Sequence, residues 1–352
     1  MEDLEITFDH SYIYVNKEKF FPIIQEQTPD SATFDSANGL LISVKCFDED
    51  VDWDTSYAQA EAAAAQGKWI IWELDISPRE TPLFLQDSAF FFSLGLAIEE
   101  FLRRLWKPFK ENSIGVSLFR GSVNFTEAFL WTEQHEEHYA EKAQEYPLLP
   151  KTLLKQIFAA DVLVEYLHRL ASFLPDTLLV FCLLDVSFVK SSAELAVLLS
   201  KERFQHILLG LKKSRTPLGH LNWEEGACLG GWIGRGAPYF SSVPDIKTAV
   251  CLPTGEKISS EVLALLDKTF ENLGRFDVPF RIVEENRLNE SWDGIDDLLV
   301  LTSSLSHQGL RKLQGFLAAG GRIISIGPSL GLESEISLED FTKHLIEAEV
   351  FF

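Results

Sequence analysis

The chain has 352 residues, of which 46% are hydrophobic and 24% are charged, and its formal net charge is −22. This composition excludes disorder for the bulk of the chain. The length is enough for about two domains. So negative a protein repels nucleic-acid phosphates and anionic membrane surfaces. We therefore exclude nucleic acid and membranes as principal partners and expect a neutral or cationic ligand, a class that includes sugars.

The sequence predicts a cytoplasmic protein. Its four cysteines form no CxxC pair, which indicates buried thiols in a reducing compartment; they are Cys46, Cys182, Cys228 and Cys251. The first residues are acidic and lack the basic segment and apolar stretch of a signal peptide. No segment runs for about 18 residues without a charge, so we expect no membrane span.

The first part of the chain is predicted to alternate strands and helices. A hairpin is expected over 5–24, with Asn16-Lys17 at its turn, and a loop over 25–38. The expected strands are 39–47, 68–76, 113–121, 177–186 and 204–211. The expected helices are 54–66, 88–106, 151–173 and 190–201, and the stretches 122–150 and 212–245 are expected to be irregular. This alternation is typical of a parallel α/β architecture.

A second regular block begins at about residue 246. Its expected strands are 247–253, 279–285, 296–304 and 322–327, and its expected helices are 258–273 and 307–321. These elements predict a compact open-sheet α/β unit. We therefore divide the chain into a domain over 1–245 and a second domain over 246–352.

The second block has an acidic residue ahead of an apolar strand, then a helix that ends in AAGG, then another apolar strand, over 296–327. This arrangement resembles the class I glutamine-amidotransferase-like fold, a flavodoxin-like open sheet. It resembles above all the catalytically silent version that follows the barrel in family 42 β-galactosidases, where it helps to form trimers. An active amidotransferase places a nucleophilic cysteine after the last strand, where this sequence has Gly327-Pro328-Ser329. We therefore expect no glutaminase activity.

The first block resembles a (β/α) barrel of the glycosidase kind. Its hairpin, YIYVNKEKFFPI, is similar to the opening found ahead of many glycosidase barrels, with Glu18 in place of the usual glycine. Five strands are expected before residue 245, whereas a complete barrel has eight. Three alternatives remain: a reduced barrel, further strands in the irregular stretches, or closure of the same barrel by the strands after 246. We prefer the two-domain arrangement.

Charged residues at strand ends are the candidates for chemistry, because barrel enzymes have their active sites at the C-terminal ends of the strands. Glycoside hydrolysis requires two carboxylates, and Glu73, Asp75 and Asp185 are the candidate catalytic residues. Lys45 and Arg120 are candidate substrate-binding residues, since an arginine near a carboxylate favours its charged form. The alternative is that these charges meet water or form structural ion pairs.

A second candidate is the segment that follows the fifth expected strand. Trp223, Glu224 and Glu225 place two carboxylates beside a ring that could stack on a sugar. A loop with two solvated glutamates is the alternative. Four other tryptophans could stack on sugars or lie in the core: Trp53, Trp69, Trp72 and Trp131.

Other motifs indicate neither a metal nor a cofactor. His135 and His138 share a helix face but lack further zinc ligands, so we expect a solvated acidic helix there. GxGxxG and P-loop sequences are absent, so we expect no nucleotide cofactor.

The fourth expected strand departs from the family pattern. In the retaining glycosidases that the first block resembles, this strand ends in Asn-Glu, with the glutamate as proton donor. Here it ends Leu184-Asp185-Val186. The sequence therefore predicts a glycosidase-related protein that has lost catalysis and acts as a carbohydrate-binding or assembly module, with a second copy or another protein as partner. The alternative is an active glycoside hydrolase that uses strand-end carboxylates on a neutral saccharide.

Overall fold

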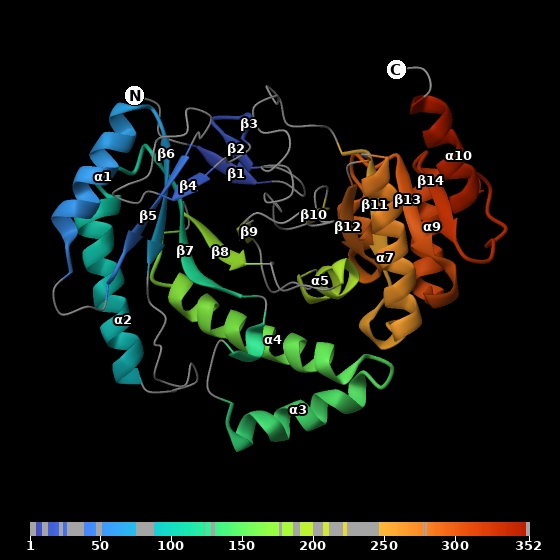
Figure 1. The fold of residues 1–352 in the computed structure, drawn as a ribbon, viewed down its shortest axis with the longest axis horizontal. Coiled ribbons are helices and arrows are strands. Elements are labelled where there is room, and N and C mark those ends of the chain that lie inside the picture. The colour runs from blue at the N-terminus through green and yellow to red at the C-terminus, as the bar shows by residue number, and fades with distance from the viewer. Residues whose placement is uncertain are drawn as a thin grey trace.

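The computed structural model describes residues 5–8, 13–20, 24–26, 39–46, 51–74, 88–122, 124–127, 131–175, 178–185, 191–199, 207–210, 221–223, 246–276, 278 and 280–349. Within these residues the fold is mixed α/β, with two six-stranded parallel sheets and one three-stranded antiparallel sheet (Figure 1). The parallel α/β class predicted from the strand–helix alternation is therefore confirmed.

The small sheet forms at the predicted hairpin. Its strands are β1 (Ile6–Phe8), β2 (Ile13–Val15) and β3 (Glu18–Phe20), paired in sequence order. The turn between β2 and β3 consists of Asn16 and Lys17, whose φ angles are 51° and 70°. Two consecutive positive φ angles belong to the type I′ turn, whose twist matches that of antiparallel strands.

The first parallel sheet has its strands in the order in which they follow along the chain. They are β4 (Ile24–Glu26), β5 (Gly39–Val44), β6 (Trp69–Leu74), β7 (Ser113–Ser122), β8 (Leu179–Asp185) and β9 (Ile207–Gly210). Strand β4 lies where the sequence predicted the junction of a hairpin and a loop. Within the described residues, β4 and β9 do not pair, so the described sheet is open.

Within the described residues, the helices of this first unit are α1 (Trp53–Ala65), α2 (Ser88–Phe101), α3 (Glu133–Glu145), α4 (Lys151–Ala171) and α5 (Ser192–Leu199). A π-helical turn, Leu102–Trp106, extends α2, and a 3₁₀ turn, Phe125–Glu127, follows β7. The prediction of irregular structure over 122–150 was wrong where α3 lies, and α3 contains the acidic segment around His135 and His138 for which a helix was expected.

The second parallel sheet runs in the order β10 (Leu221–Trp223), β12 (Phe280–Glu284), β11 (Thr248–Leu252), β13 (Asp297–Leu301), β14 (Arg322–Ile326) and β15 (Glu335–Ser337). From β11 onward this order is 2-1-3-4-5, which is that of a doubly wound sheet. Strand β10 precedes residue 246, so this sheet includes one strand from the preceding region. Within the described residues, neither β11 nor any later strand pairs with the first sheet.

Helices cover both faces of the second sheet: α7 (Ser260–Arg275), α8 (Leu288–Ser291), α9 (His307–Ala318) and α10 (Leu338–Glu349). Short 3₁₀ turns follow the strands at Gly255–Lys257, Glu285–Arg287 and Thr302–Ser304. Phe270 of α7 and Phe341 of α10 lie in the larger apolar cluster, and Leu313 and Phe316 of α9 lie in a smaller one. Because alternate strand residues face opposite ways, the sheet separates the two clusters.

The larger apolar cluster is continuous between the two units. It includes Trp72 of β6 in the first unit and Phe270 of α7 in the second, and Cys46 is buried within it. Figure 1 shows α5 between the first sheet and α7, so this helix lies at the junction of the units. A shared core of this kind fixes the two sheets relative to each other.

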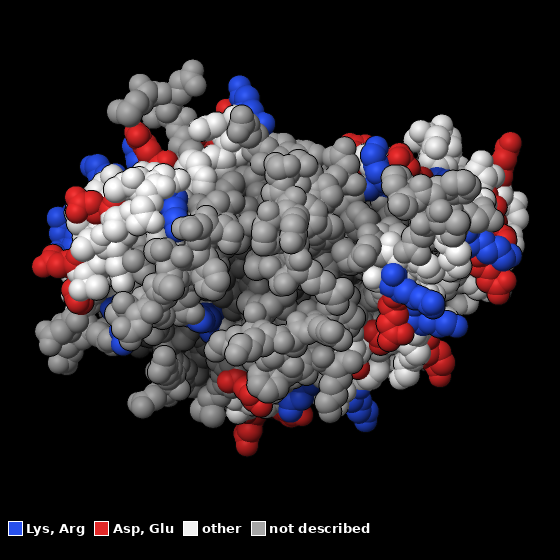
Figure 2. Space-filling view, turned by 45° about the horizontal axis from the view of Figure 1, so that its top comes forward, with Lys and Arg blue, Asp and Glu red and all other residues white. Residues whose placement is uncertain are grey.

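Acidic and basic side chains are interspersed on the surface seen in Figure 2, with no broad basic area on the described part of that face. Within the described residues, no helix combines the length and apolar character that crossing a bilayer requires.

Candidate functional site

Glu73 lies near the C-terminal end of β6, on the face of the sheet opposite the helical core. Its neighbour Trp72 faces the other way, where its ring packs edge-on against Phe101 at 5.5 Å and its Nε1–H donates to Ser113 Oγ at 2.9 Å. Alternation along the strand then directs Glu73 away from α2. The glutamate is nevertheless only 6% exposed. A buried carboxylate needs hydrogen bonds or an opposite charge nearby.

Residues of both neighbouring strands supply these partners. Ser43 on β5 is in register with Glu73, and its Oγ–H donates to Oε2 of the carboxylate. Arg120 on β7 donates from Nη1 to Oε1 at 3.4 Å and to Oε2 at 3.3 Å. The Arg120 side chain is 44% exposed, whereas that of Glu73 is 8% exposed. The pair therefore joins a buried acceptor to a donor group that reaches solvent.

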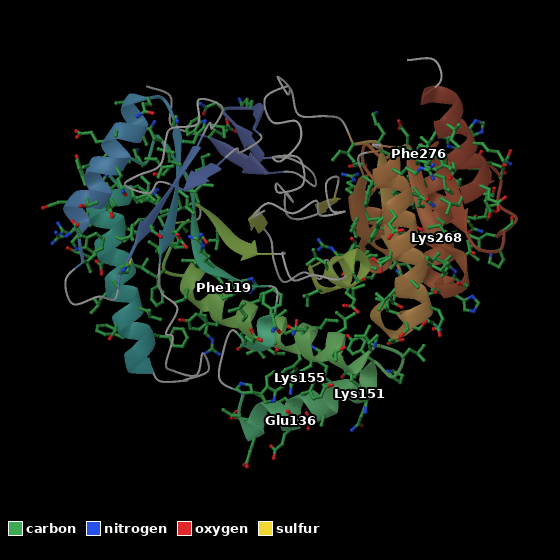
Figure 3. The ribbon with its side chains drawn as sticks, in the orientation of Figure 1. Phe119, Glu136, Lys151, Lys155, Lys268 and Phe276 are labelled. Atoms are coloured by element: carbon green, nitrogen blue, oxygen red, sulfur yellow. The ribbon has the colours of Figure 1, made fainter. Side chains whose placement is uncertain are left out.

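A bulge in β7 brings Arg120 to this face. The register with β8 shifts between Ser117 and Phe119, so that one extra residue is inserted in β7. An inserted residue reverses the face of the sheet toward which each later side chain of the strand points. Ser117 Oγ–H donates to the carbonyl oxygen of Phe119 at 3.0 Å within the bulge, and Phe119 is labelled in Figure 3. Strict alternation would have placed Ser117 and Arg120 on opposite faces.

A side-chain network fixes the segment after β7. Gln156 of α4 donates from Nε2 to Asn124 Oδ1 and, at 3.2 Å, to Thr126 Oγ1. Thr126 Oγ1–H donates in turn to Asn124 Oδ1 at 2.9 Å. The segment that follows β7, the strand of Arg120, is thereby attached to the long helix α4.

The structure brings together two of the predicted site residues, Glu73 and Arg120. Lys45 is exposed directly after β5. Asp75, Glu224 and Glu225 lie outside the described residues. Asp185 ends β8 and Trp223 ends β10, and the described residues include their backbones without their side chains.

Trp223 lies in a strand, within the stretch 212–245 that the sequence had predicted to be irregular. It belongs to β10, where it is in register with Ile282 of the second sheet. The three-residue length of β10 and its glycine-rich surroundings gave no strand pattern. Ser43 and the bulge at Ser117 are the parts of the site that sequence reasoning missed, and the serine at the end of a buried apolar strand was the available signal.

The described tryptophans mostly have packing roles. Trp72 is fully buried in the core. The guanidinium carbon of Arg104 lies 5.6 Å from the centroid of the Trp53 ring. Trp131 packs against Phe158 with ring centroids 5.5 Å apart, and Lys155 Nζ lies 4.3 Å from its centroid. Figure 3 shows Lys155 on α4 above Glu136 on α3, and their ionic groups are 3.6 Å apart.

His135 serves as part of a helix cap. Its Nδ1 accepts the backbone N–H of Thr132 at 3.0 Å, so the imidazole closes the first turn of α3. Burial, and then the neighbouring His138, lower the pKa of His135. Within the described residues, no group of three or more His, Cys, Asp or Glu side chains is arranged to hold a metal ion.

The loop after β14 is held by Glu335. Its Oε1 accepts the N–H of Leu330 at 2.7 Å, and its Oε2 accepts the N–H of Leu332 at 3.0 Å and the hydroxyl of Ser329 at 3.0 Å. The chain then enters β15 rather than a helix. Ser329 is therefore a loop residue that binds a carboxylate, and it does not occupy the strand-to-helix elbow of nucleophilic enzymes.

No model of a known protein family matches the sequence, and no curated protein does either. Among solved structures, an exo-β-1,4-mannosidase from Opitutaceae bacterium strain TAV5 is similar, with a TM-score of 0.46 and 9% identity over 89% of this chain and 78% of that chain. A β-galactosidase from the Antarctic haloarchaeon Halorubrum lacusprofundi has a TM-score of 0.47 and 9% identity over 89% of this chain and 73% of that chain. Because both TM-scores are below 0.5, this likeness carries no argument about activity.

Proposed function

We propose that the chain is a glycosidase-related protein that binds a neutral saccharide at the Glu73–Arg120 pair without hydrolysing it. In this proposal the first sheet is part of a (β/α) barrel and the second sheet belongs to an amidotransferase-like unit that lacks its nucleophile. The sequential order of the parallel strands β4 to β9 is compatible with a barrel, since neighbours in the chain are neighbours in the sheet.

The contact between Glu73 and Arg120 is the observation that supports saccharide binding. The carboxylate has about four acceptor sites, and Ser43 and Arg120 occupy part of them. The Arg120 side chain is 44% exposed, so part of its guanidinium faces solvent beside the carboxylate. Sugar hydroxyls both donate and accept hydrogen bonds, so an acceptor beside a donor suits them. A strand end rather than a loop holds the pair, which fixes its geometry.

Hydrolysis requires a second carboxyl group that donates a proton. The end of β8 would supply it in the glycosidases that the first block resembles, and here that strand ends in Leu184-Asp185. Binding without turnover is therefore the first candidate. An active hydrolase is the second candidate, favoured by the position of Glu73 at the strand edge where barrel enzymes have their catalytic residues. It would use Asp75 or Asp185 as the acid.

Calorimetric titration of the full chain with galactose, mannose, lactose and cellobiose tests the proposal. We expect one of these sugars to bind and the Glu73→Gln and Arg120→Met variants to weaken that binding. Glu61→Gln, an exposed charge change on α1, serves as the control and is expected to bind normally. Absence of binding for every sugar contradicts the saccharide proposal.

Nitrophenyl glycosides distinguish the two candidates. We expect no release of nitrophenol by the wild-type chain. Release that Glu73→Gln abolishes and Glu61→Gln preserves would instead establish the hydrolase. Sedimentation of the same samples tests the assembly role: a strict monomer that binds no sugar contradicts both the binding and the assembly forms of the proposal.

A further inference from the structure

A cavity of about 660 Å³ lies between the two units, away from the Glu73 site. Its lining comes from α3, α4 and α5 on one side and from the carboxyl ends of β11 and β12 on the other. The volume is in the range of sites for small organic molecules. In open α/β sheets, ligands bind outside the carboxyl ends of the strands. Position and size therefore both suit a ligand.

The first wall is one face of α4. Val164 and Glu165 lie three and four residues after Asp161, and His168 lies four and three residues after them, so the four side chains line the cavity together. Lys142 of α3 forms an ion pair with Asp161, and both side chains are about a quarter exposed. This pair neutralises one of the carboxylates on the α4 wall, and the other, Glu165, accepts from Nη2 of Arg169 at 2.9 Å at its exposed edge.

The second wall belongs to the other unit. Thr254 and Glu256 follow β11, and Glu284 and Asn286 lie at the end of β12. Glu256 is exposed, so its carboxylate reaches the solvent in the cavity. Carboxylates of the two units therefore line the same cavity, and a positive charge between them would lower their repulsion.

The charges of the lining select the ligand class. The lining has four carboxylates and one lysine; the carboxylates are Asp161, Glu165, Glu256 and Glu284. Neutral polar groups come from Tyr146, Thr254 and Asn286, and apolar contact comes from Val164, Val197 and Ile258. An anion is disfavoured in such a cavity, whereas a primary ammonium on a small apolar or hydroxylated body matches its acceptors and its surfaces.

We propose that this cavity is a binding site for a small amine-bearing cation that contacts both units at once. The shared chemistry is the primary ammonium, which an aliphatic diamine and an amino sugar both have. The site does not depend on Glu73, so saccharide binding and amine binding succeed or fail separately.

Calorimetric titration of the full chain with putrescine and with glucosamine tests this proposal. Their neutral counterparts, 1,4-butanediol and glucose, show what the ammonium adds. We expect at least one amine to bind more tightly than its counterpart. Binding by putrescine alone identifies an aliphatic amine, and binding by glucosamine alone identifies an amino sugar. If neither amine exceeds its counterpart, the proposal is wrong.

Two exposed carboxylates, one from each unit, locate the binding. Glu165→Gln and Glu256→Gln are each expected to weaken amine affinity about threefold, the size typical of exposed charge pairs. The double variant is expected to weaken it about tenfold if the two contributions are independent. Glu61→Gln makes the same charge change on α1 and is expected to have no effect. Equal weakening by Glu61→Gln would show a general charge effect and would overturn the proposed site.

Hydrogen exchange gives an independent location. Saturating amine is expected to slow exchange of the backbone amides in 252–258, the segment from the end of β11 to the start of α7. Protection confined to other segments would contradict the site even if an amine binds.

Discussion

The carboxylate of Asp267 on α7 accepts the backbone N–H of Ala193 on α5 at 2.8 Å, and its other oxygen accepts the hydroxyl of Ser191 at 2.7 Å. Ser191 Oγ in turn accepts the N–H of Glu194 at 3.1 Å. Ser191 thus caps α5 from its own chain segment, while Asp267 caps it from the second unit. The two units are joined by this double cap as well as by their common apolar core.

Replacement of Asp267 by alanine is expected to destabilise the protein by about 1–2 kcal/mol, the usual cost of losing a helix cap. Asp267→Asn keeps one acceptor oxygen and is expected to cost less. Urea unfolding followed by circular dichroism measures both. Glu271→Ala, an exposed change on the same helix, is the control. If Glu271→Ala lowers the urea midpoint of unfolding as much as Asp267→Ala does, the cap by Asp267 does not contribute to stability in the way we expect.

Removal of the Arg120 side chain as Arg120→Met leaves the buried Glu73 carboxylate without its guanidinium. We expect a loss of about 1–2 kcal/mol in the free energy of unfolding, because the buried carboxylate loses a hydrogen-bond donor. The exposure of the Arg120 side chain to water limits the loss. The double variant with Glu73→Gln is expected to lose less than the sum of the single losses. Strictly additive losses in urea unfolding would show that the two side chains are not coupled.

Local patterns predicted most of the strands and helices. The apolar runs at 68–76 and 113–121 became β6 and β7, and the helix predicted over 258–273 became α7, because burial on a sheet face or a helix face leaves a periodic signal. The turn at Asn16 and Lys17 was also predictable, since its residue types and position between two β-rich runs are local information.

Long-range relationships were not predictable in this way. Glu73 and Arg120 were both predicted as candidates, but a single extra residue in β7 decides whether they face each other, and a bulge has no reliable sequence signature. The pairing of β10 with β12 joins residues far apart in the chain, and three residues are too few for a periodic pattern. The cap by Asp267 likewise depends on packing between units.

Acid is expected to remove the stabilising effect of Glu335. Burial raises the pKa of this carboxyl, but hydrogen bonds from Ser325, Leu330, Leu332 and Ser329 outweigh that effect and hold the pKa below its usual value of 4.5. A pKa that is lower in the folded state gives stability that is present above the unfolded value and is lost as the pH falls through the folded value.

The difference in unfolding free energy between the wild type and Glu335→Gln is therefore expected to be constant above about pH 5 and to shrink as the pH falls below 4.5. Urea unfolding from pH 7 to pH 3.5 measures it. Glu333→Gln changes an exposed glutamate of the same loop and is expected to leave the profile unchanged. A pH-independent difference for Glu335→Gln would contradict the role of the charge.

Gly309, in the first turn of α9, is closely packed against Glu285. The Glu285 side chain is 2% exposed, and its Oε1 accepts the N–H of Ser306 at 3.1 Å. A methyl group at Gly309 would overlap this carboxylate and lie 2.8 Å from its Cγ. Alanine normally stabilises a helix relative to glycine by about 0.5–1 kcal/mol. Here Gly309→Ala is expected to destabilise the protein by about 1–3 kcal/mol instead, because the side chain beneath it must move.

Gly315→Ala on the same helix meets Trp292 at 3.1 Å, a tight contact without overlap, and is expected to change the free energy of unfolding by less than about 1 kcal/mol. Truncation of the carboxylate provides the decisive comparison. In a Glu285→Ala background the added methyl group finds space, so Gly309→Ala is expected to cost little there. Thermal and urea unfolding of the single and double variants measure this coupling. An equal cost of Gly309→Ala in both backgrounds would show that the glycine is needed for a reason other than Glu285.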